Sequence, residues 1–258
     1  MRRCGLVLVL ACCGPRIRAI GPDVSRDVPG CRRDHNVVDV GDVGDAPLAV
    51  VYEHAMFFST DIPAAVLWPD GTLAFSDKRA WFTAALGAAE ATRIAGDAAA
   101  ALRAAPRHAE SNRDETDQPI VELVVRDGSH WRVSDVRGLV RGDRGDGAAA
   151  AYRELLARAH GGTTHYAPES ISVDYEPVAD YTGELAWPAD IAPPIDPDVA
   201  GEVVVAATAE PVLRELERDT QRSGRAIVVA GTHVRIRLSR RFRGQAAIDR
   251  VLECARER

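Results

Sequence analysis

Histidine is the residue type in this sequence best suited to chemistry, because its imidazole can bind a metal ion or carry a proton near neutral pH. His160 and His165 lie five positions apart. Two imidazoles at this spacing could ligate a metal. However, Gly161 and Gly162 would break the helix needed to place them on one face, and no third ligand is adjacent. We therefore predict a histidine at a helix end, a second histidine in a loop, and no metal site.

A second pair of histidines, His130 and His233, lies in two similar stretches. At 128–133 and 231–236 the chain reads glycine, small hydroxyl residue, histidine, apolar residue, arginine and β-branched residue. An apolar run before each glycine and alternating residues after it predict two β-hairpins. The two histidines would occupy equivalent hairpin positions, either as partly exposed cross-strand residues or as members of a binding surface.

Motifs for covalent or phosphate chemistry are missing from the sequence. It contains neither a GxSxG elbow for a serine nucleophile nor a GxxxxGK[ST] phosphate loop. Paired carboxylates such as Glu115 with Asp117 have the same sequence pattern as solvated loop residues. We predict no catalytic residue and no cofactor. The alternative is a small hydrolase whose histidine and carboxylate site is assembled only in three dimensions.

Residues 1–13 have the layout of an export signal. A basic start precedes a short apolar run at 6–11, and the stretch 9–12 resembles the bacterial lipobox, in which the cysteine is lipidated. The apolar run is too short to span a bilayer. We predict an exported cell-envelope protein, lipid-anchored at Cys12. A mis-called start, which would leave a cytoplasmic protein, is the alternative.

Residues 14–47 have the composition of a flexible linker, because glycine, proline, aspartate and arginine leave little to bury. Two cysteines lie beyond the signal, Cys31 in this linker and Cys254 near the chain end. In an oxidising envelope they could form a disulfide and tie the tail to the last helix. Two unrelated thiols are an equal alternative.

Composition limits the class of protein. With 258 residues and 46% apolar residues, the chain can bury a core. The net charge of −6, with both signs spread along the chain, provides no basic field for phosphate backbones. We therefore expect no nucleic-acid partner, and contact with a membrane only through the lipid anchor.

The pattern of the remaining chain predicts a single α+β domain over 48–258, with helices packed on one face of an antiparallel sheet. Expected strands lie at 48–52, 64–75, 120–138, 170–175 and 226–244, and expected helices at 97–105, 148–160, 208–223 and 245–256. Thr208 is the expected cap of the third helix, with Val212, Leu213 and Leu216 as its apolar face. The order helix, hairpin, helix occurs at 97–160 and again at 208–256. Two related halves would explain this order, and chance similarity of two turns is the alternative.

Several short motifs follow these elements in a recognisable order. They are Asp70-Gly71, 166–169 (Tyr-Ala-Pro-Glu), Trp187-Pro188 and 208–210 (Thr-Ala-Glu). In this order, after residue 48, the chain resembles a set of uncharacterised secreted proteins and lipoproteins of high-GC bacteria. The resemblance implies a secreted α+β protein and no particular activity.

The expected function is therefore a non-enzymatic binding or interaction module of the cell envelope. An exposed sheet face, or the proline-rich segment around Trp187, would form the contact surface. Trp187, His130 and His233 are the candidate binding residues. The partner would be a protein or another envelope ligand.

Overall fold

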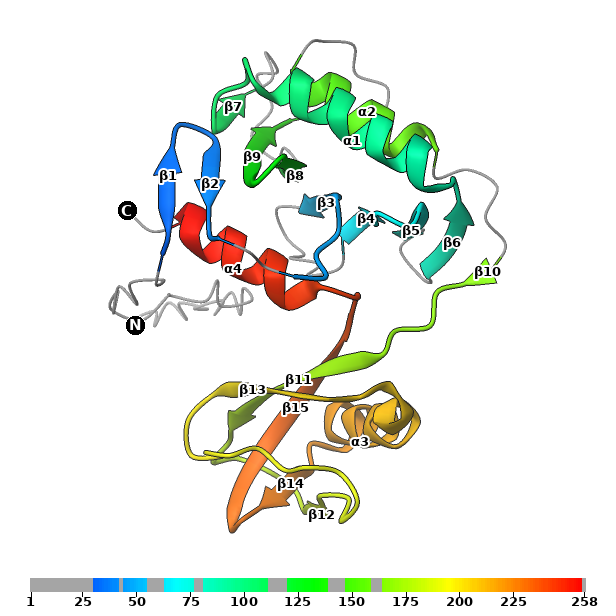
Figure 1. Cartoon of the computed structure of the whole chain (residues 1–258). Helices are drawn as coiled ribbons and strands as arrows, with labels where there is room; N and C mark the ends of the chain where they lie inside the picture. The colour runs from blue at the N-terminus through cyan, green and yellow to red at the C-terminus, as the bar shows by residue number, and fades with distance from the viewer. Residues whose placement is uncertain are drawn as a thin grey trace, which may run out of the picture.

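The computed structural model describes residues 30–41, 44–54, 63–76, 81–110, 120–138, 147–158 and 164–256. These residues form two bodies, each with its own sheet (Figure 1). The α+β class built from hairpins is confirmed. We call the body with the larger sheet the first body and the other the second body.

The first body contains a ten-stranded sheet in the order β1-β2-β9-β8-β3-β4-β5-β6-β10, with β7 paired to β9. Its strands are β1 (Arg32–Asp34), β2 (Val37–Asp39), β3 (Ala49–His54), β4 (Pro63–Leu67), β5 (Thr72–Ser76), β6 (Trp81–Ala85), β7 (His108–Glu110), β8 (Ile120–Asp127), β9 (His130–Arg137) and β10 (Thr164–His165). Except for the β7–β9 pair, the neighbours in this sheet are antiparallel.

Helices cover both faces of this sheet. α1 (Ala88–Leu102) and α2 (Ala148–Ala157) pack on one face, where Val51 and Leu123 point, and α4 (Gln245–Arg256) packs on the other, where Val50 and Val124 point. Successive strand residues point to opposite faces, so each strand contributes to two cores. Helices were expected on one face, but α4, the last element of the chain, returns to cover the opposite one.

The second body contains a five-stranded sheet in the order β12-β14-β15-β11-β13. Its elements are β11 (Ser170–Pro177), β12 (Glu184–Ala186), β13 (Gly201–Ala206), a short 3₁₀ turn η1 (Ala207–Ala209), α3 (Glu210–Ser223), β14 (Ala226–Val229) and β15 (Thr232–Arg241). One face of this sheet packs around Leu213 of α3. No helix among the described residues covers the other face, which we call the open face.

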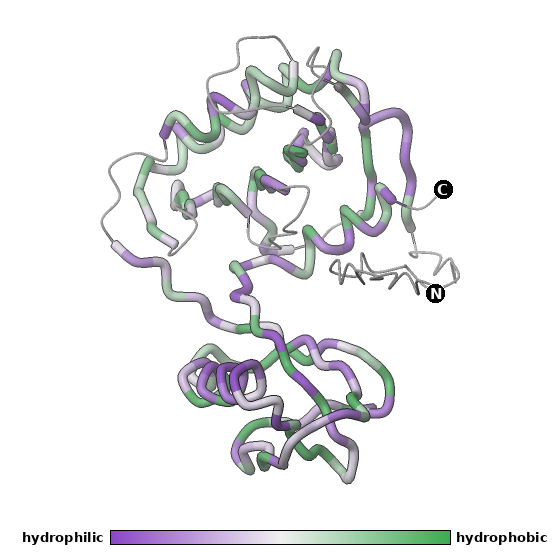
Figure 2. The backbone as a smooth tube through the Cα atoms, turned by 180° about the vertical axis from the view of Figure 1, so that it is seen from behind, coloured by the Kyte–Doolittle hydropathy of each residue, from purple (hydrophilic) through white to green (hydrophobic). Residues whose placement is uncertain are grey.

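The second body is inserted between β10 and α4 of the first. The chain leaves the first body through 166–169 and returns through 242–244 (Figure 1), and Figure 2 shows the same two connections from behind. The hairpins expected to share one sheet therefore lie in different sheets, β8–β9 in the first and β14–β15 in the second. Each hairpin contributes to a separate core, so the expected single domain over 48–258 is divided into two bodies.

Part of the segment expected to be a linker is folded. The strands β1 and β2 join the first sheet, and Asn36 between them is buried. The Asn36 amide donates to the backbone oxygens of Leu102 and Ala105, at 2.6 and 2.7 Å, and so satisfies carbonyls that the end of α1 leaves without helical partners. Residues 1–29, including the expected signal and Cys12, lie outside the described residues.

Two expected helix starts differ from the structure. α1 begins at Ala88, nine residues before the expected Asp97, because a stripe of alanines and Ile94 packs its early turns into the core. Thr208 does not cap α3: it lies in η1, and the N-cap residue Ala209 makes no side-chain cap hydrogen bond. Gly224 ends α3 in the left-handed conformation, with φ of 69°, as expected.

Candidate functional site

The structure does not bring the predicted binding residues together. His130 is at the tip of the β8–β9 hairpin, 3.8 Å from a carboxylate oxygen of Asp39. His233, in the other sheet, has its Nε2 atom 2.8 Å from Oε1 of Glu184, and the Tyr181 ring stacks on it at 4.1 Å. These are two separate surface contacts between a histidine and an acid.

Trp187 has a structural role. Its indole N–H donates to the backbone oxygen of Ile191, and its ring packs against the core of the second body. The His165 ring packs against Phe82 in a tilted arrangement, with the ring centroids 4.8 Å apart, while His160 falls outside the described residues. Within the ranges that the structure describes, no three histidine, cysteine or acidic side chains are grouped so that they could hold a metal.

The two expected disulfide cysteines are joined. Cys31, just before β1, and Cys254, in the last turn of α4, form a disulfide with their Cα atoms 5.7 Å apart. The disulfide fixes the N-terminal hairpin to the helix that covers the second face of the first sheet.

An aromatic cluster holds the two connecting segments against the first body. Tyr166 of the outgoing segment and Phe242 of the returning one pack with Trp68 and Trp81, and their ring centroids are 5.5 to 6.4 Å apart. The hydroxyl of Tyr166 also accepts a hydrogen bond from the backbone N–H of Arg243, at 3.0 Å. Both connecting segments are thus held at the same place on the first sheet.

Arg243 completes this junction. Its guanidinium lies 5.3 Å from the Trp68 ring centroid and donates to Asp70 at 2.8 Å, while the Trp68 indole donates to the Arg243 backbone oxygen. The hydrogen bond from Arg243 holds the pKa of Asp70 below its usual range, and the same contact raises the pKa of Arg243. Burial raises the pKa of Tyr166, despite the hydrogen bond from Arg243.

A cleft of about 410 Å³ opens between the two bodies beside this junction. Its walls are Asp45, Glu169, Ser170, Val204 and residues 241–246, so both bodies and the start of α4 contribute. Gly244, with φ of 78°, lies where an added Cβ would be 2.4 Å from the backbone oxygen of Asp45. Only glycine allows this close approach of the two backbones at the cleft wall.

Two carboxylates that line the cleft are not held in ion pairs. Arg241 donates to Glu202 and Asp249, at 2.7 and 2.8 Å, and Arg243 is held by Asp70. In the part of the chain that the structure describes, no ion pair joins Asp45 or Glu169 to a basic side chain. Neither carboxylate is thus held in an ion pair, although the charge of Asp45 acts on Arg243 from a longer distance and raises its pKa. A cationic group of a ligand could pair with them directly.

The open face of the second sheet continues into this cleft. Ser172 accepts a hydrogen bond from Arg241 and donates to Glu202, and Val204 is half-exposed beside them. Further along the face, Asp174 lies opposite Arg237 and Glu176 opposite Arg235. The surface is thus polar and extended, with the cleft at one end.

The sequence indicates this region only in part. The patterns at Asp70-Gly71 and at Tyr166 are typical of turns and loops, and both contribute to the junction. No sequence pattern points to Asp45, Arg241 and Arg243 as one site, because most of the chain separates Asp45 from the two arginines. Comparison of the chain with protein families, with curated proteins and with solved structures gave no match.

Proposed function

We propose that this protein is a binding module of the cell envelope, and that the cleft and the adjoining open face are its contact surface. The observation that carries the proposal is a cleft lined by both bodies, with two unpaired carboxylates, Asp45 and Glu169. The ligand class that fits is an extended peptide with a lysine or arginine side chain. Such a side chain would enter the cleft while the peptide backbone lies along the sheet.

The hydrolase alternative has less support. A hydrolytic site needs a base and its orienting acid in a concave place where a substrate bond can lie. The contact between His233 and Glu184 is at the far end of the second sheet, among residues that do not line the cleft. None of the residues that line the cleft is a histidine.

The test is binding of labelled peptides, followed by fluorescence anisotropy. One pool of random decapeptides contains lysine and arginine, and a second pool contains aspartate and glutamate in their place. The basic pool should bind more tightly, and the double substitution Asp45→Asn with Glu169→Gln should weaken its binding about tenfold, because two unpaired charges are removed.

A matched control separates the cleft from overall charge. Glu90→Gln with Glu154→Gln removes the same charge from exposed ion pairs of α1 and α2 with Arg158 and Arg93. This control should bind the basic pool like the unmodified protein. Equal binding of both peptide pools, or equal loss in both double variants, would contradict the proposal.

We also propose that the protein is exported and lipid-anchored at Cys12. The disulfide between Cys31 and Cys254 supports export, because such bonds persist in oxidising compartments and are rare in the cytosol. No helix in the described ranges is long and apolar enough to cross a membrane. The resemblance to secreted proteins and lipoproteins of high-GC bacteria agrees with this proposal.

A further inference from the structure

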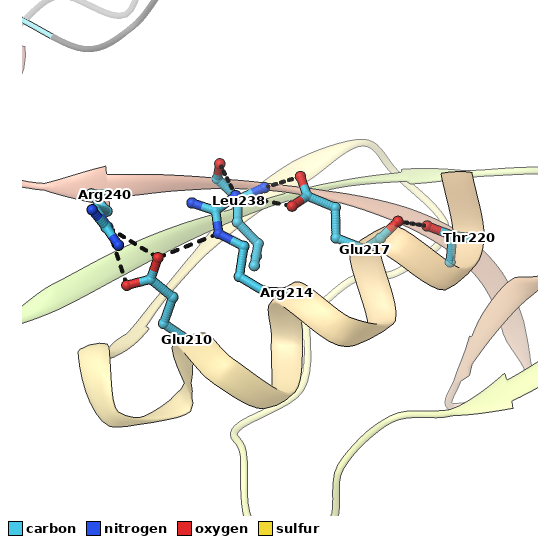
Figure 3. A network of polar contacts seen from close by, with 6 residues as sticks. All are labelled: Glu210, Arg214, Glu217, Thr220, Leu238 and Arg240. Atoms are coloured by element: carbon cyan, nitrogen blue, oxygen red, sulfur yellow. Dashed lines mark hydrogen bonds and ion pairs between the residues drawn. The ribbon is translucent and has the colours of Figure 1, made fainter. Parts of the chain in front are cut away.

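The two sides of the second sheet differ in whether their outer backbone groups have hydrogen-bond partners. β14 pairs with β15 only at residues 232–234, so beyond that point β15 has β11 on one side and no strand on the other. Side chains of α3 take the place of the missing strand. Glu217 accepts from the N–H of Leu238 at 2.9 Å, and Arg214 donates to the oxygen of Leu238 at 3.3 Å (Figure 3). The backbone N–H and oxygen of Leu238 at this edge are therefore satisfied within the chain.

The opposite edge, β13, has no such cover among the described residues. β13 is the last strand in the sheet order and pairs on its inner side with β11. The hydrogen bond from the N–H of Ala207 to the oxygen of Glu169 shows which residues of β13 direct their backbone groups toward β11. In an antiparallel pair, residues 201, 203 and 205 then bond to β11, while the backbone groups of Glu202, Val204 and Ala206 point outward.

The composition of β13 favours pairing with another strand. It reads Gly-Glu-Val-Val-Val-Ala, without the lysine or proline that commonly protects a free edge. Val204, at its centre, is 51% exposed. The described large apolar side chains that are exposed all belong to the second body: Tyr181, Ile195, Val199, Val204 and Val212. Val204 lies in β13, and Val199 precedes the strand by two residues.

We propose that β13 pairs antiparallel with β13 of a second copy of this chain, about a two-fold axis at Val204. The strand is compatible with itself in this register: Glu202 faces Ala206 of the partner, so no two carboxylates are opposed. Glu202 is also paired with Arg241 of its own chain, at 2.7 Å. The pairing is isologous and closes after two subunits.

This dimer goes beyond the proposed binding function and does not depend on it. A two-fold axis perpendicular to the sheet would join the two five-stranded sheets into one continuous sheet. Both open faces, and both clefts, would then lie on the same side of the assembly. The dimer would present two equivalent sites to one partner.

Light scattering coupled to size-exclusion chromatography, over a concentration series, tests the pairing. The unmodified protein should change from monomer to dimer with rising concentration. Val204→Pro should remain monomeric, because proline removes an outward N–H and leaves the inner bonds of β13 to β11 in place. Val204→Thr, which keeps the N–H and the β-branched shape, should still dimerise.

Hydrogen exchange locates the contact. In the dimer, exchange in the 201–206 segment should slow at least about tenfold with rising protein concentration, because outward amides become bonded. Circular dichroism of Val204→Pro checks that the variant is folded. The proposal is overturned if the unmodified chain stays monomeric, if folded Val204→Pro still dimerises, or if a dimer forms without slower exchange in this segment.

Discussion

At the scale of single residues, the first body contains a buried carboxylate, Glu122 of β8, whose side chain is 7% exposed. Arg107 and Arg256 lie 3.5 and 3.4 Å from its oxygens, and His54 lies at 3.8 Å. Burial alone would raise the pKa of Glu122. The hydrogen bond from His54 and the charges of Arg256 and Arg107 together outweigh burial, so the pKa of Glu122 is lowered.

The lowered pKa gives the sign of a pH dependence. Glu122 stabilises the fold fully above the ordinary carboxyl pKa of about 4.3, and this contribution is lost as the pH falls through the lower native value. Glu122→Gln should lower the free energy of unfolding by about 3–5 kcal/mol at neutral pH, because it leaves the largely buried Arg107 without its anionic partner. The difference from the unmodified protein should shrink in acid. Urea unfolding at a series of pH values measures both effects.

An exposed carboxylate provides the control. Glu154 is paired with Arg93 at 3.4 Å on the surface. Glu154→Gln should change the free energy of unfolding by less than about 0.5 kcal/mol. If Glu122→Gln is as stable as this control, the buried cluster does not stabilise the first body.

At the scale of elements, α3 is held to its sheet by apolar packing and by a hydrogen bond between one of its side chains and the backbone of β15. Leu213 is fully buried, and Glu217 satisfies the backbone N–H of Leu238 (Figure 3). Val212, expected on the apolar face, is 48% exposed. The helix therefore packs through a narrow apolar stripe, and the acidic Glu217 is buried next to this stripe. A sequence pattern alone would predict that an acidic residue such as Glu217 faces solvent.

Removing the Glu217 carboxylate should affect one backbone group most. Glu217→Ala leaves the N–H of Leu238 without an acceptor and should cost about 1–3 kcal/mol. Hydrogen exchange of the 234–241 segment should become faster in this variant. Glu215→Ala, an exposed acid on the same helix, is the matched control and should leave exchange in this segment unchanged. Equal effects of the two substitutions would show that Glu217 does not protect the edge.

At the scale of the whole molecule, two long-range connections define the first body. The disulfide joins residues separated by 223 positions, and such a bond restricts the unfolded chain and contributes about 2–4 kcal/mol. The second body lies between β10 and α4, so the first body is complete only after the second has been synthesised. The cleft exists because both connections cross at one aromatic cluster.

The compartment can be tested on the protein taken from membranes of its host. Mass spectrometry should find a mature chain that begins at a lipidated Cys12. Cys31 and Cys254 should react with an alkylating reagent only after reduction. The chain 12–258 expressed in a bacterial cytosol is the control and should contain free thiols. An intact Met1, or free thiols in the protein from its host, would contradict export.

Much of the secondary structure could be predicted from the sequence, because local patterns control it. The hairpins around Gly128 and Gly231, the turn at Asp70-Gly71 and the end of α3 at Gly224 all follow from alternation and glycine placement. α1 begins at Ala88, earlier than the sequence pattern predicts. In that segment, packing of alanines in the core decides the boundary, and propensity alone does not.

The sequence by itself determined the α+β class, the two hairpins and the two cysteines that could pair. It did not determine that the hairpins belong to different sheets, since a strand pattern records which side chains are buried and not which neighbour covers them. Only the tertiary structure brought Asp45, Glu169 and Arg241 to one cleft. Their proximity results from two chain crossings and from the return of α4, and contacts over such separations leave no local pattern in the sequence.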